Sequence, residues 1–356
     1  GPELPLSEGI VDAFVKEGLK IVGPCQDAAR LESSKVFAKE FMKRHKIPTA
    51  DYKVFTSFSM AEEYLRMKPL PIVIKADGLA AGKGVFIAKD IEEALNALRL
   101  ILKDRIFGDA GKTVIIEQCL MGEEASFMVF TDGETIIPMV SSQDHKRVFD
   151  NDEGPNTGGM GAYSPAPVVT DHLQDRVMKD IIHPTIKGLR AEGITYKGIL
   201  YAGLMICDGK PFVLEYNCRM GDPETQPVLM RLDSDLLDVS LGIANGNLQN
   251  CEVRWSDKSS VCVVLASGGY PDKYEKGLEI KGLDKVRGLN DVVVFHAGTD
   301  LKDDKIITSG GRVLGVTAIG DSIRSAQQRA YEAIGYIHFD KMHYRKDIAN
   351  RALKKR

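Results

Sequence analysis

Residues 71–88 read PIVIKADGLAAGKGVFIA, and this stretch decides the fold. The apolar runs 72–76 and 85–88 predict two strands, with the glycine-rich segment 78–84 between them. The segment is not a Walker A loop, because only three residues separate its first two glycines and because a strand follows it instead of a helix. Taken alone, it fits a flexible hairpin tip as well as a phosphate-binding flap. In a flap, its small residues would let backbone amides approach phosphate oxygens and Lys83 would add positive charge.

Lys75 favours the phosphate interpretation of this segment. It stands inside the otherwise apolar strand predicted at 72–76. A buried lysine needs an anionic partner, and a phosphate would serve.

A further strand is predicted at 210–214, where the sequence KPFVL leads into Glu215 and Asn217. Residues i and i+2 of a strand share a face, so this carboxylate and this amide oxygen point the same way. Such hard oxygen ligands suit Mg²⁺, which completes its coordination with water and substrate phosphates. A Glu-x-Asn pair on a solvent-facing strand is the alternative. The following residues 219–226, RMGDPETQ, crowd acids, an arginine and turn formers into one corner, which favours a charged ligand.

The composition excludes several classes of protein. The 356 residues are 44% hydrophobic and 27% charged, and the net charge of -3 gives no global positive field for nucleic acid. No apolar run is long enough to cross a bilayer, and no signal peptide opens the sequence, so no membrane partner is expected. Six scattered cysteines, with no Cys-x-x-Cys pair, indicate reduced thiols in a cytoplasmic protein.

Three other segments are candidate ligand contacts. At 117–124 a strand ends and another begins; the backbone edge there could hydrogen-bond adenine and a carboxylate could hold a ribose, although a solvated acidic turn is the commoner alternative. The long loop 141–167 fails as a calcium site because its glycine comes one place early and its twelfth position is Gly161. Its basic trio and bare backbone amides suit a small anionic substrate instead. The glycine pair before Arg312 fits a ligand contact or a simple hairpin turn.

The remaining pattern predicts the order of the elements. Residues 7–17 predict a helix with Ser7 as N-cap and Gly18 after its end, and residues 19–23 predict a strand. Together they look like the tail of an α/β unit, so we expect the sequence to start inside a domain, unless Gly1-Pro2 is the remnant of a tag. The other predictions are helices at 34–45, 91–103 and 323–337, strands at 113–117, 125–130, 260–266, 292–297 and 312–318, and a β-rich unit at about 50–120.

In this order, the segments resemble the phosphoribosylamine–glycine ligases, or glycinamide ribonucleotide synthetases, of the ATP-grasp family. The resemblance extends over essentially the whole chain, and the run GPNTGGMGAYSP at 154–165 is highly specific to this ligase within the fold. The other matching stretches are 1–3 with 5–6, 74–85, 122–127, 142–147, 215–219, 221–226, 309–314 and 337–340.

The resemblance implies an α/β and α+β chain. The fold would be an ATP-grasp fold with a partial N-terminal α/β (Rossmann-like) domain and a C-terminal α+β domain. The implied boundaries are 1–33 for the N-terminal remnant, 34–52 with 121–258 for the central domain, 53–120 for the lid and 259–356 for the C-terminal domain. The family also carries an upstream segment that helps to bind the phosphoribosyl substrate. Because this sequence lacks it, an ATP-binding but inactive fragment is an alternative to an active enzyme.

The implied reaction converts ATP, glycine and 5-phosphoribosylamine into ADP, phosphate and glycinamide ribonucleotide through a glycyl phosphate, in de novo purine biosynthesis. A monomer that uses Mg²⁺ or Mn²⁺ is expected. Another ATP-grasp carboxylate–amine ligase, with a different carboxylate, is a further alternative.

The resemblance also assigns roles to residues of this sequence. The implied metal ligands are Glu215 and Asn217, and the implied catalytic residues are Arg219, Lys83 and Asp222. The implied ATP contacts are Lys35, Lys75, Lys83 and Gly84 at the phosphates, Glu117, Cys119 and Leu120 at the adenine, and Glu124 at the ribose. The implied substrate contacts are Lys146, Gly158, Gly159, Met160, Gly161 and Arg312.

Overall fold

The structure, a computed structural model, describes residues 2–79 and 84–354. The chain forms two units, each assembled from separate stretches of sequence. Unit 1 comprises Gly1–Pro138, Thr170–Met220 and Leu237–Cys251, and unit 2 comprises Met139–Val169, Gly221–Leu236 and Glu252–Arg356. Lys83, predicted to act in the flap, lies outside the described residues.

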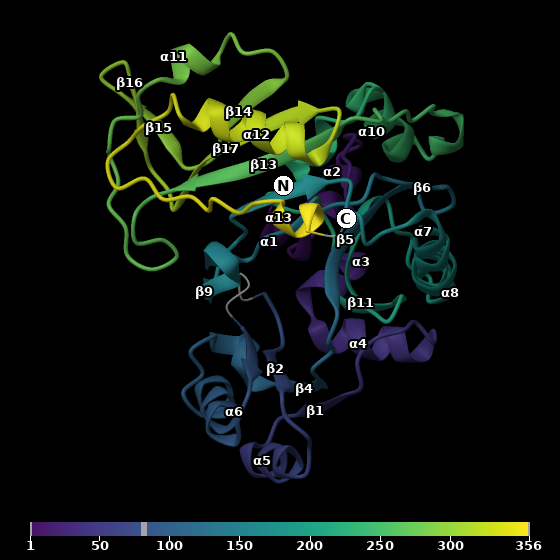
Figure 1. Cartoon of the computed structure of the whole chain (residues 1–356). Helices are drawn as coiled ribbons and strands as arrows, with labels where there is room; N and C mark the ends of the chain where they lie inside the picture. The colour runs from purple at the N-terminus through teal and green to yellow at the C-terminus, as the bar shows by residue number, and fades with distance from the viewer. Residues whose placement is uncertain (1, 80–83, 355–356) are drawn as a thin grey trace. The chain divides into compact units, whose positions relative to one another are not determined.

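The first sheet of unit 1 contains most of the stretch 71–88. Its four strands are β1 (Tyr52–Phe55), β4 (Val114–Gln118), β2 (Ile72–Ala76) and β3 (Val85–Ala88), in that spatial order and antiparallel throughout. Helices α5 (Phe58–Arg66) and α6 (Ile91–Leu98) accompany this sheet (Figure 1). Their small and apolar residues, such as Ala61 and Ala94, join Ile72 and Ile74 in one buried cluster. The predicted β-rich unit and the strands on both sides of the glycine-rich segment are thereby confirmed.

The second sheet of unit 1 carries the predicted metal ligands. Its order is β12 (Lys210–Asn217), β11 (Gly198–Cys207), β5 (Glu123–Thr131) and β6 (Ile136–Pro138). The predicted helix at 34–45 is confirmed as α4 (Lys35–Arg44), and Ser34 caps it by accepting a hydrogen bond from the Phe37 amide at 3.1 Å. The other helical segments of unit 1 are α3 (Gln26–Ser33), η1 (Arg99–Lys103), η2 (Gly108–Lys112), α7 (Asp171–Val177), η4 (Met178–Ile182), α8 (His183–Ala191), α10 (Leu236–Asn245) and η5 (Leu248–Asn250).

The N-terminal predictions are partly wrong. In place of one helix at 7–17 there are two short ones, α1 (Glu3–Ser7) and α2 (Ile10–Lys16), separated at Gly9, whose φ of 84° breaks the helical path. Ser7 therefore ends α1 instead of capping the next helix, while Gly18 follows the end of α2 as predicted, with φ of 68°. Residues 19–23 form no strand, because no other strand in the described part of the chain pairs with them.

Unit 2 is built on a five-stranded antiparallel sheet. Its order is β14 (Val292–His296), β17 (Arg312–Gly320), β13 (Ser259–Ala266), β10 (Gly161–Ser164) and β7 (Gln143–Asp144). Helix α12 (Ile323–Ile334) lies along this sheet in Figure 1 and contributes Ala326, Ala330 and Ala333 to its core. These elements confirm the strands and the helix predicted after residue 259. The smaller elements are β8 (Arg147–Phe149), η3 (Asp150–Asp152), β9 (Glu153–Asn156), α9 (Thr225–Leu229), α11 (Leu283–Val286), β15 (Thr299–Lys302), β16 (Lys305–Thr308) and α13 (Asn350–Leu353).

The segment predicted as a long loop at 141–167 contains strands β7 to β10. Because β10 pairs with β13, this segment belongs with the C-terminal sheet in unit 2. The domain boundaries implied by the resemblance stay a prediction.

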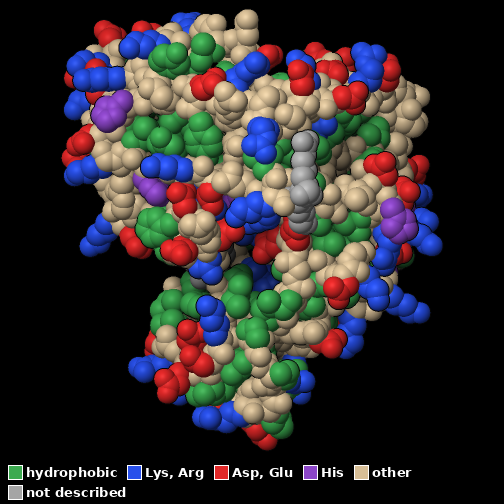
Figure 2. All heavy atoms as spheres, in the orientation of Figure 1, with side chains coloured by type: hydrophobic (Ala, Val, Ile, Leu, Met, Phe, Trp, Pro, Cys, Tyr) green, Lys and Arg blue, Asp and Glu red, His purple; other side chains and the backbone are tan. Residues whose placement is uncertain are grey.

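The surface carries charges of both signs. On the face shown in Figure 2, acidic and basic side chains are interspersed. Within the described residues, the helices are all too short or too polar to pass through a bilayer.

Candidate functional site

Strand β12 places Glu215 and Asn217 on one face. Gly203 of β11 pairs with Glu215, but the next residue, Leu204, pairs with Val213, so Leu214 is the extra residue of a β-bulge. Beyond the bulge, Tyr216 is buried and its hydroxyl lies 2.7 Å from the hydroxyl of Thr185, whereas Glu215 and Asn217 are half-buried. Bulges re-aim side chains in this way. The same-face arrangement predicted for the pair is therefore present.

Lys75 contacts the same strand at the bulge. Its ammonium donates to the carbonyl of Leu214 at 3.3 Å and lies 3.0 Å from Oε2 of Glu117. Glu117 is thus an anionic partner for this lysine within the protein, and the predicted phosphate contact stays a prediction. Both side chains are buried, with 7% of Lys75 and 2% of Glu117 exposed.

Lys39 completes this cluster, and the sequence analysis missed it. Its ammonium also lies 3.0 Å from Oε2 of Glu117 and donates to Oγ1 of Thr49 at 2.7 Å. Burial lowers the pKa of Lys39 to about 8. The available signal was its spacing from Lys35, because residues i and i+4 share a helix face. Two ammonium groups thus face one carboxylate, and Oε1 of Glu117 has no hydrogen-bond partner in the described part of the chain. The cluster is suited to receive a further anion or a hydrogen-bond donor.

Lys35 connects helix α4 to the glycine-rich segment. Its ammonium donates to the carbonyl of Gly78 at 2.8 Å, and burial lowers its pKa. Beside it, Asp77 accepts hydrogen bonds from the amide of Val36 at 3.1 Å and from the hydroxyl of Ser34 at 3.2 Å. At the other end of the segment, the carbonyl of Gly84 accepts from the amide of Ala76 at 2.9 Å and closes the base of the hairpin.

Arg219 is held by Glu32, another residue that the sequence analysis missed. Nη2 of Arg219 lies 2.9 Å from Oε1 of Glu32, and the other oxygen of Glu32 accepts from the amide of Cys218 at 2.7 Å. Burial raises the pKa of Glu32, although Arg219 opposes this. No local pattern indicates the pair, because 186 residues separate Cys218 from Glu32.

The predicted adenine and ribose contacts lie where β4 passes into β5. Glu117 is buried in β4, Cys119 and Leu120 are half-buried in the turn, and Glu124 is half-buried in β5. Burial raises the pKa of the Cys119 thiol. The structure thus brings Glu117 together with Lys75, while the assignment of these residues to adenine and ribose stays a prediction.

In unit 2, three predicted residues meet although they are far apart in sequence. Nη1 of Arg312 donates to the carbonyl of Gly158 at 2.7 Å and to that of Asp222 at 2.9 Å, and Nη2 lies 2.9 Å from Oδ2 of Asp222. The Gly158 amide in turn donates to the hydroxyl of Tyr270 at 3.0 Å. Gly159 follows with φ of 111°, and a Cβ there would lie 2.3 Å from Cδ of Pro223. Only glycine fits at this position.

The other predicted substrate contacts have different surroundings. The Lys146 carbonyl accepts hydrogen bonds from the amide and the hydroxyl of Thr157, at 2.7 and 2.9 Å. Met160 is completely buried in the core of unit 2, and Gly161 begins β10. Met160 therefore anchors the loop by packing into the core of unit 2.

Two family models match the chain. The model of the "phosphoribosylglycinamide synthetase, ATP-grasp (A) domain" matches residues 33–225, and that of the C domain matches residues 260–351. The chain belongs to the phosphoribosylglycinamide synthetase family. The predicted resemblance and the predicted ATP-grasp fold are both confirmed.

Relatives of this synthetase chain are similar over nearly its whole length. The phosphoribosylamine–glycine ligase of Vibrio parahaemolyticus is 55% identical over 99% of this chain and 82% of its own length. That of Escherichia coli O6:H1 is 56% identical over 100% and 83%. The crystal structure of the Thermotoga maritima phosphoribosylamine–glycine ligase superposes with a TM-score of 0.84 and covers 92% of this chain and 81% of that chain, at 39% sequence identity. The biotin carboxylase domain of the Hydrogenobacter thermophilus 2-oxoglutarate carboxylase, at 16% identity and a TM-score of 0.75, shares the fold.

The residues of this synthetase family member fit a magnesium or manganese ion that is only partly held by protein. Among the described residues, His, Cys, Asp and Glu side chains form no group of three that could hold a metal. Glu215 and Asn217 offer two hard oxygen ligands on one half-buried face. This donor set suits an ion that takes its remaining ligands from water and phosphate.

Proposed function

We propose that this chain is an ATP-dependent carboxylate–amine ligase that joins glycine to 5-phosphoribosylamine. The products are glycinamide ribonucleotide, ADP and phosphate, in de novo purine biosynthesis. The observation that carries the proposal is the 55% identity over 354 residues to a relative named phosphoribosylamine–glycine ligase. A cytoplasmic location and a monomeric state, both expected from the sequence, stay predictions.

The chemistry requires activation of a carboxylate, because a carboxylate is a poor electrophile towards an amine. The glycine carboxylate attacks the γ-phosphate of ATP, and ADP leaves. The amine of phosphoribosylamine then attacks the carbonyl of the glycyl phosphate, the new C–N bond forms, and phosphate leaves with the bonding electrons. The protein contributes mainly orientation and neutralisation of charge.

The groups of unit 1 suit ATP. Glu215 and Asn217 would hold Mg²⁺ or Mn²⁺, which when bound neutralises charge on the triphosphate. Lys35 and Lys75, joined by Lys39, supply positive charge for the phosphates. The flap residues Lys83 and Gly84 would cover them. Glu117 with the backbone at Cys119 and Leu120 would hold the adenine, Glu124 the ribose, and Arg219 the γ-phosphate and the acyl phosphate.

The groups of unit 2 suit glycine and phosphoribosylamine. Arg312 is fixed by Gly158 and Asp222, so its guanidinium is oriented before a substrate arrives. Lys146, Gly159 and Gly161 belong to the same loop. Lys146 would supply a cation, whereas the Gly159 amide donates to Oγ1 of Thr157 at 2.9 Å and helps to fix the loop. Met160 supports the loop through packing.

A turnover assay tests the proposal. With ATP, glycine and 5-phosphoribosylamine present, we expect ADP release and a product with the mass of glycinamide ribonucleotide, and no product when either co-substrate is omitted. If another carboxylate supports ADP release and glycine does not, the chain is a different ATP-grasp ligase. If ATP raises the melting temperature but no amine–carboxylate pair releases ADP, the chain is an inactive nucleotide-binding fragment. Either outcome overturns the proposal.

A further inference from the structure

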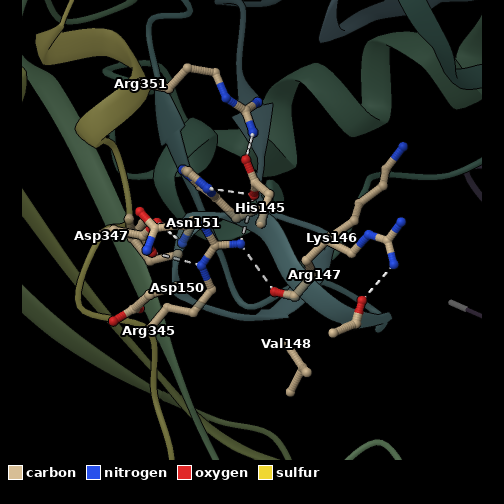
Figure 3. A network of polar contacts seen from close by, with 12 residues as sticks. His145, Lys146, Arg147, Val148, Asp150, Asn151, Arg345, Asp347 and Arg351 are labelled. Carbon is tan, nitrogen blue, oxygen red and sulfur yellow. Dashed lines mark hydrogen bonds and ion pairs between the residues drawn. The ribbon is translucent and has the colours of Figure 1, made fainter.

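Arg345 is a buried cation at the centre of a network in unit 2 (Figure 3). Its side chain is 0% exposed. The guanidinium group is bidentate to Asp347, because Nε donates to Oδ1 at 2.7 Å and Nη2 donates to Oδ2 at 2.8 Å. Its third nitrogen, Nη1, donates to Oδ1 of Asp152 at 2.8 Å and to the carbonyl of Arg147 at 3.1 Å. A buried ion pair is a poor source of stability, because desolvation offsets the attraction. Its rigid geometry, however, sets orientation strongly.

Asp152 is the point at which two arginines and a histidine converge. Arg351 donates to Oδ2 of Asp152 at 3.0 Å, while Arg345 occupies Oδ1. The imidazole of His145, with Nδ1 3.8 Å from Oδ1, and these guanidinium groups hold the pKa of Asp152 well below its usual range. The carboxylate thus stays ionised and holds both arginines, whereas Nδ1 of His145 makes no hydrogen bond with it among the described residues.

The segment 345–351 holds the segment 145–152 at several further points. The Ala349 amide donates to Nε2 of His145 at 3.0 Å, and the amide of Lys346 donates to Oδ1 of Asp150 at 2.8 Å. Three non-glycine residues in these two segments have positive φ: Asn151 at 60°, Asp152 at 57° and Ala349 at 69°. Such conformations persist only where the surroundings over-determine them, and they cluster at functional sites.

His145 transmits this fixed geometry to the loop that carries the predicted substrate contacts. Its amide donates to the carbonyl of Gly161 at 2.9 Å, and its carbonyl accepts from the amide of Met160 at 2.8 Å. The next residue, Lys146, binds Thr157 through its carbonyl, and its side chain extends away from the network in Figure 3. Between Thr157 and Met160 lies Gly158, which contacts Arg312.

We propose that Arg345, through Asp152 and the carbonyl of Arg147, is a positioning residue for the substrate loop, residues 144–161. It holds Lys146 and the glycines of that loop in the geometry that glycine and phosphoribosylamine require. The inference rests on the proposed function for the identity of these substrates. Arg345 itself touches no reacting atom.

The first test separates substrate binding from ATP binding. Arg345→Lys keeps the charge and loses the fork, so we expect KM for glycine or phosphoribosylamine to rise about ten-fold or more, as for a displaced positioning group. KM for ATP should stay within about two-fold, because the ATP contacts lie in unit 1. The side chain of Arg351 is 30% exposed, so the variant Arg351→Met should fold readily. Its KM for glycine or phosphoribosylamine should rise as well, but by less. Arg329→Met is the matched control, because Arg329 binds one aspartate and one carbonyl elsewhere in unit 2.

The second test does not need turnover. Amide hydrogen exchange at Thr157 and Met160 should speed up in both Arg345→Lys and Arg351→Met, while the amides of β13 and β17 keep their protection. Unchanged loop exchange, or equal rises of KM for all three substrates, would overturn the inference. If the wild-type chain makes no glycinamide ribonucleotide, the proposed function fails, and the exchange experiment still decides whether Arg345 positions the loop.

Discussion

At the scale of single residues, Glu215 carries the most specific prediction. Glu215→Gln keeps the shape of the side chain and removes the charge that would hold the metal, so we expect kcat to fall by about 100-fold or more. The melting temperature should barely change, because Glu215 is only half-buried. Steady-state kinetics over a range of Mg²⁺ concentrations measures the effect, and Glu63→Gln, an exposed change on α5, is the control. Near-normal turnover of Glu215→Gln would remove the metal role.

Lys39 carries a prediction about pH. Its pKa in the folded chain is about 8, lowered by burial from the ordinary value of 10.5, so it loses its proton as pH rises through 8. We therefore expect ATP affinity to weaken between about pH 7 and pH 9.5, and Lys39→Met to bind roughly ten-fold more weakly at pH 7 and to lack this pH dependence. The free energy of unfolding changes in the opposite direction. Below pH 8 the buried charge of Lys39 lowers the stability of the folded chain, and this cost fades as pH rises from 8 towards 10.5, the ordinary pKa of a lysine.

Calorimetric titration of ATP at several pH values tests this prediction. Lys43→Met, at an exposed position on the same helix, should behave like wild type. A wild-type affinity that stays flat across pH 8 would contradict the role assigned to Lys39.

Gly159 carries a prediction about backbone geometry. Gly159→Ala would combine a φ of 111° with a Cβ 2.3 Å from Cδ of Pro223. We therefore expect the free energy of unfolding to fall by about 1–3 kcal/mol and the melting temperature to fall with it. Gly193→Ala is the control, because its φ is 79° but nothing lies within 4 Å of the added Cβ. The clash is thereby separated from the strain. Equal melting temperatures for the two variants would contradict a specific close approach at Gly159.

At the scale of elements, the contact of hairpin β8–β9 with the segment 345–351 predicts sensitivity to acid. The pKa of Asp152 is lower in the folded chain than in the unfolded chain. The ionised carboxylate therefore stabilises the folded chain fully at neutral pH, and this stabilisation is lost as pH falls below about 4, the ordinary pKa of an aspartate. Asp152→Asn should therefore lower the melting temperature at pH 7, and the gap to wild type should narrow in acid. Thermal unfolding at a series of pH values, with the exposed change Asp284→Asn as control, measures it. A gap that stays constant down to pH 3 would argue against this network.

The same scale shows what the sequence could predict. Strands β2 and β3 were predictable because their apolar runs are local, and α4 because Ser34 caps it. The strand expected at 19–23 was wrong, since strand formation depends on a partner as well as on composition. The contact of Arg345 with Asp152 spans 193 residues and has no local signature, and Lys39 reads as an ordinary helix lysine until Glu117 is seen beside it.

At the scale of the whole molecule, the predicted groups divide between the two units. The residues assigned to ATP and metal belong to unit 1, and Asp222, Arg312 and the substrate loop belong to unit 2. The chain passes from one unit to the other between Met220 and Gly221, directly between the predicted catalytic residues Arg219 and Asp222. The reaction therefore has to be tested on the intact chain.

The bulge at Leu214 determines which side chains of β12 face the core. Counted from Val213, which is buried, uninterrupted alternation would turn Glu215 towards the core and Tyr216 towards the ligand face. The inserted residue shifts the phase of β12 by one position, so that Tyr216 is buried and the carboxylate is not. Deletion of Leu214 would restore regular alternation from Val213 and keep Glu215 and Tyr216 on their present faces, but it would remove the carbonyl that Lys75 contacts. The face that Glu215 occupies is therefore set by the number of residues in this strand as well as by their identity.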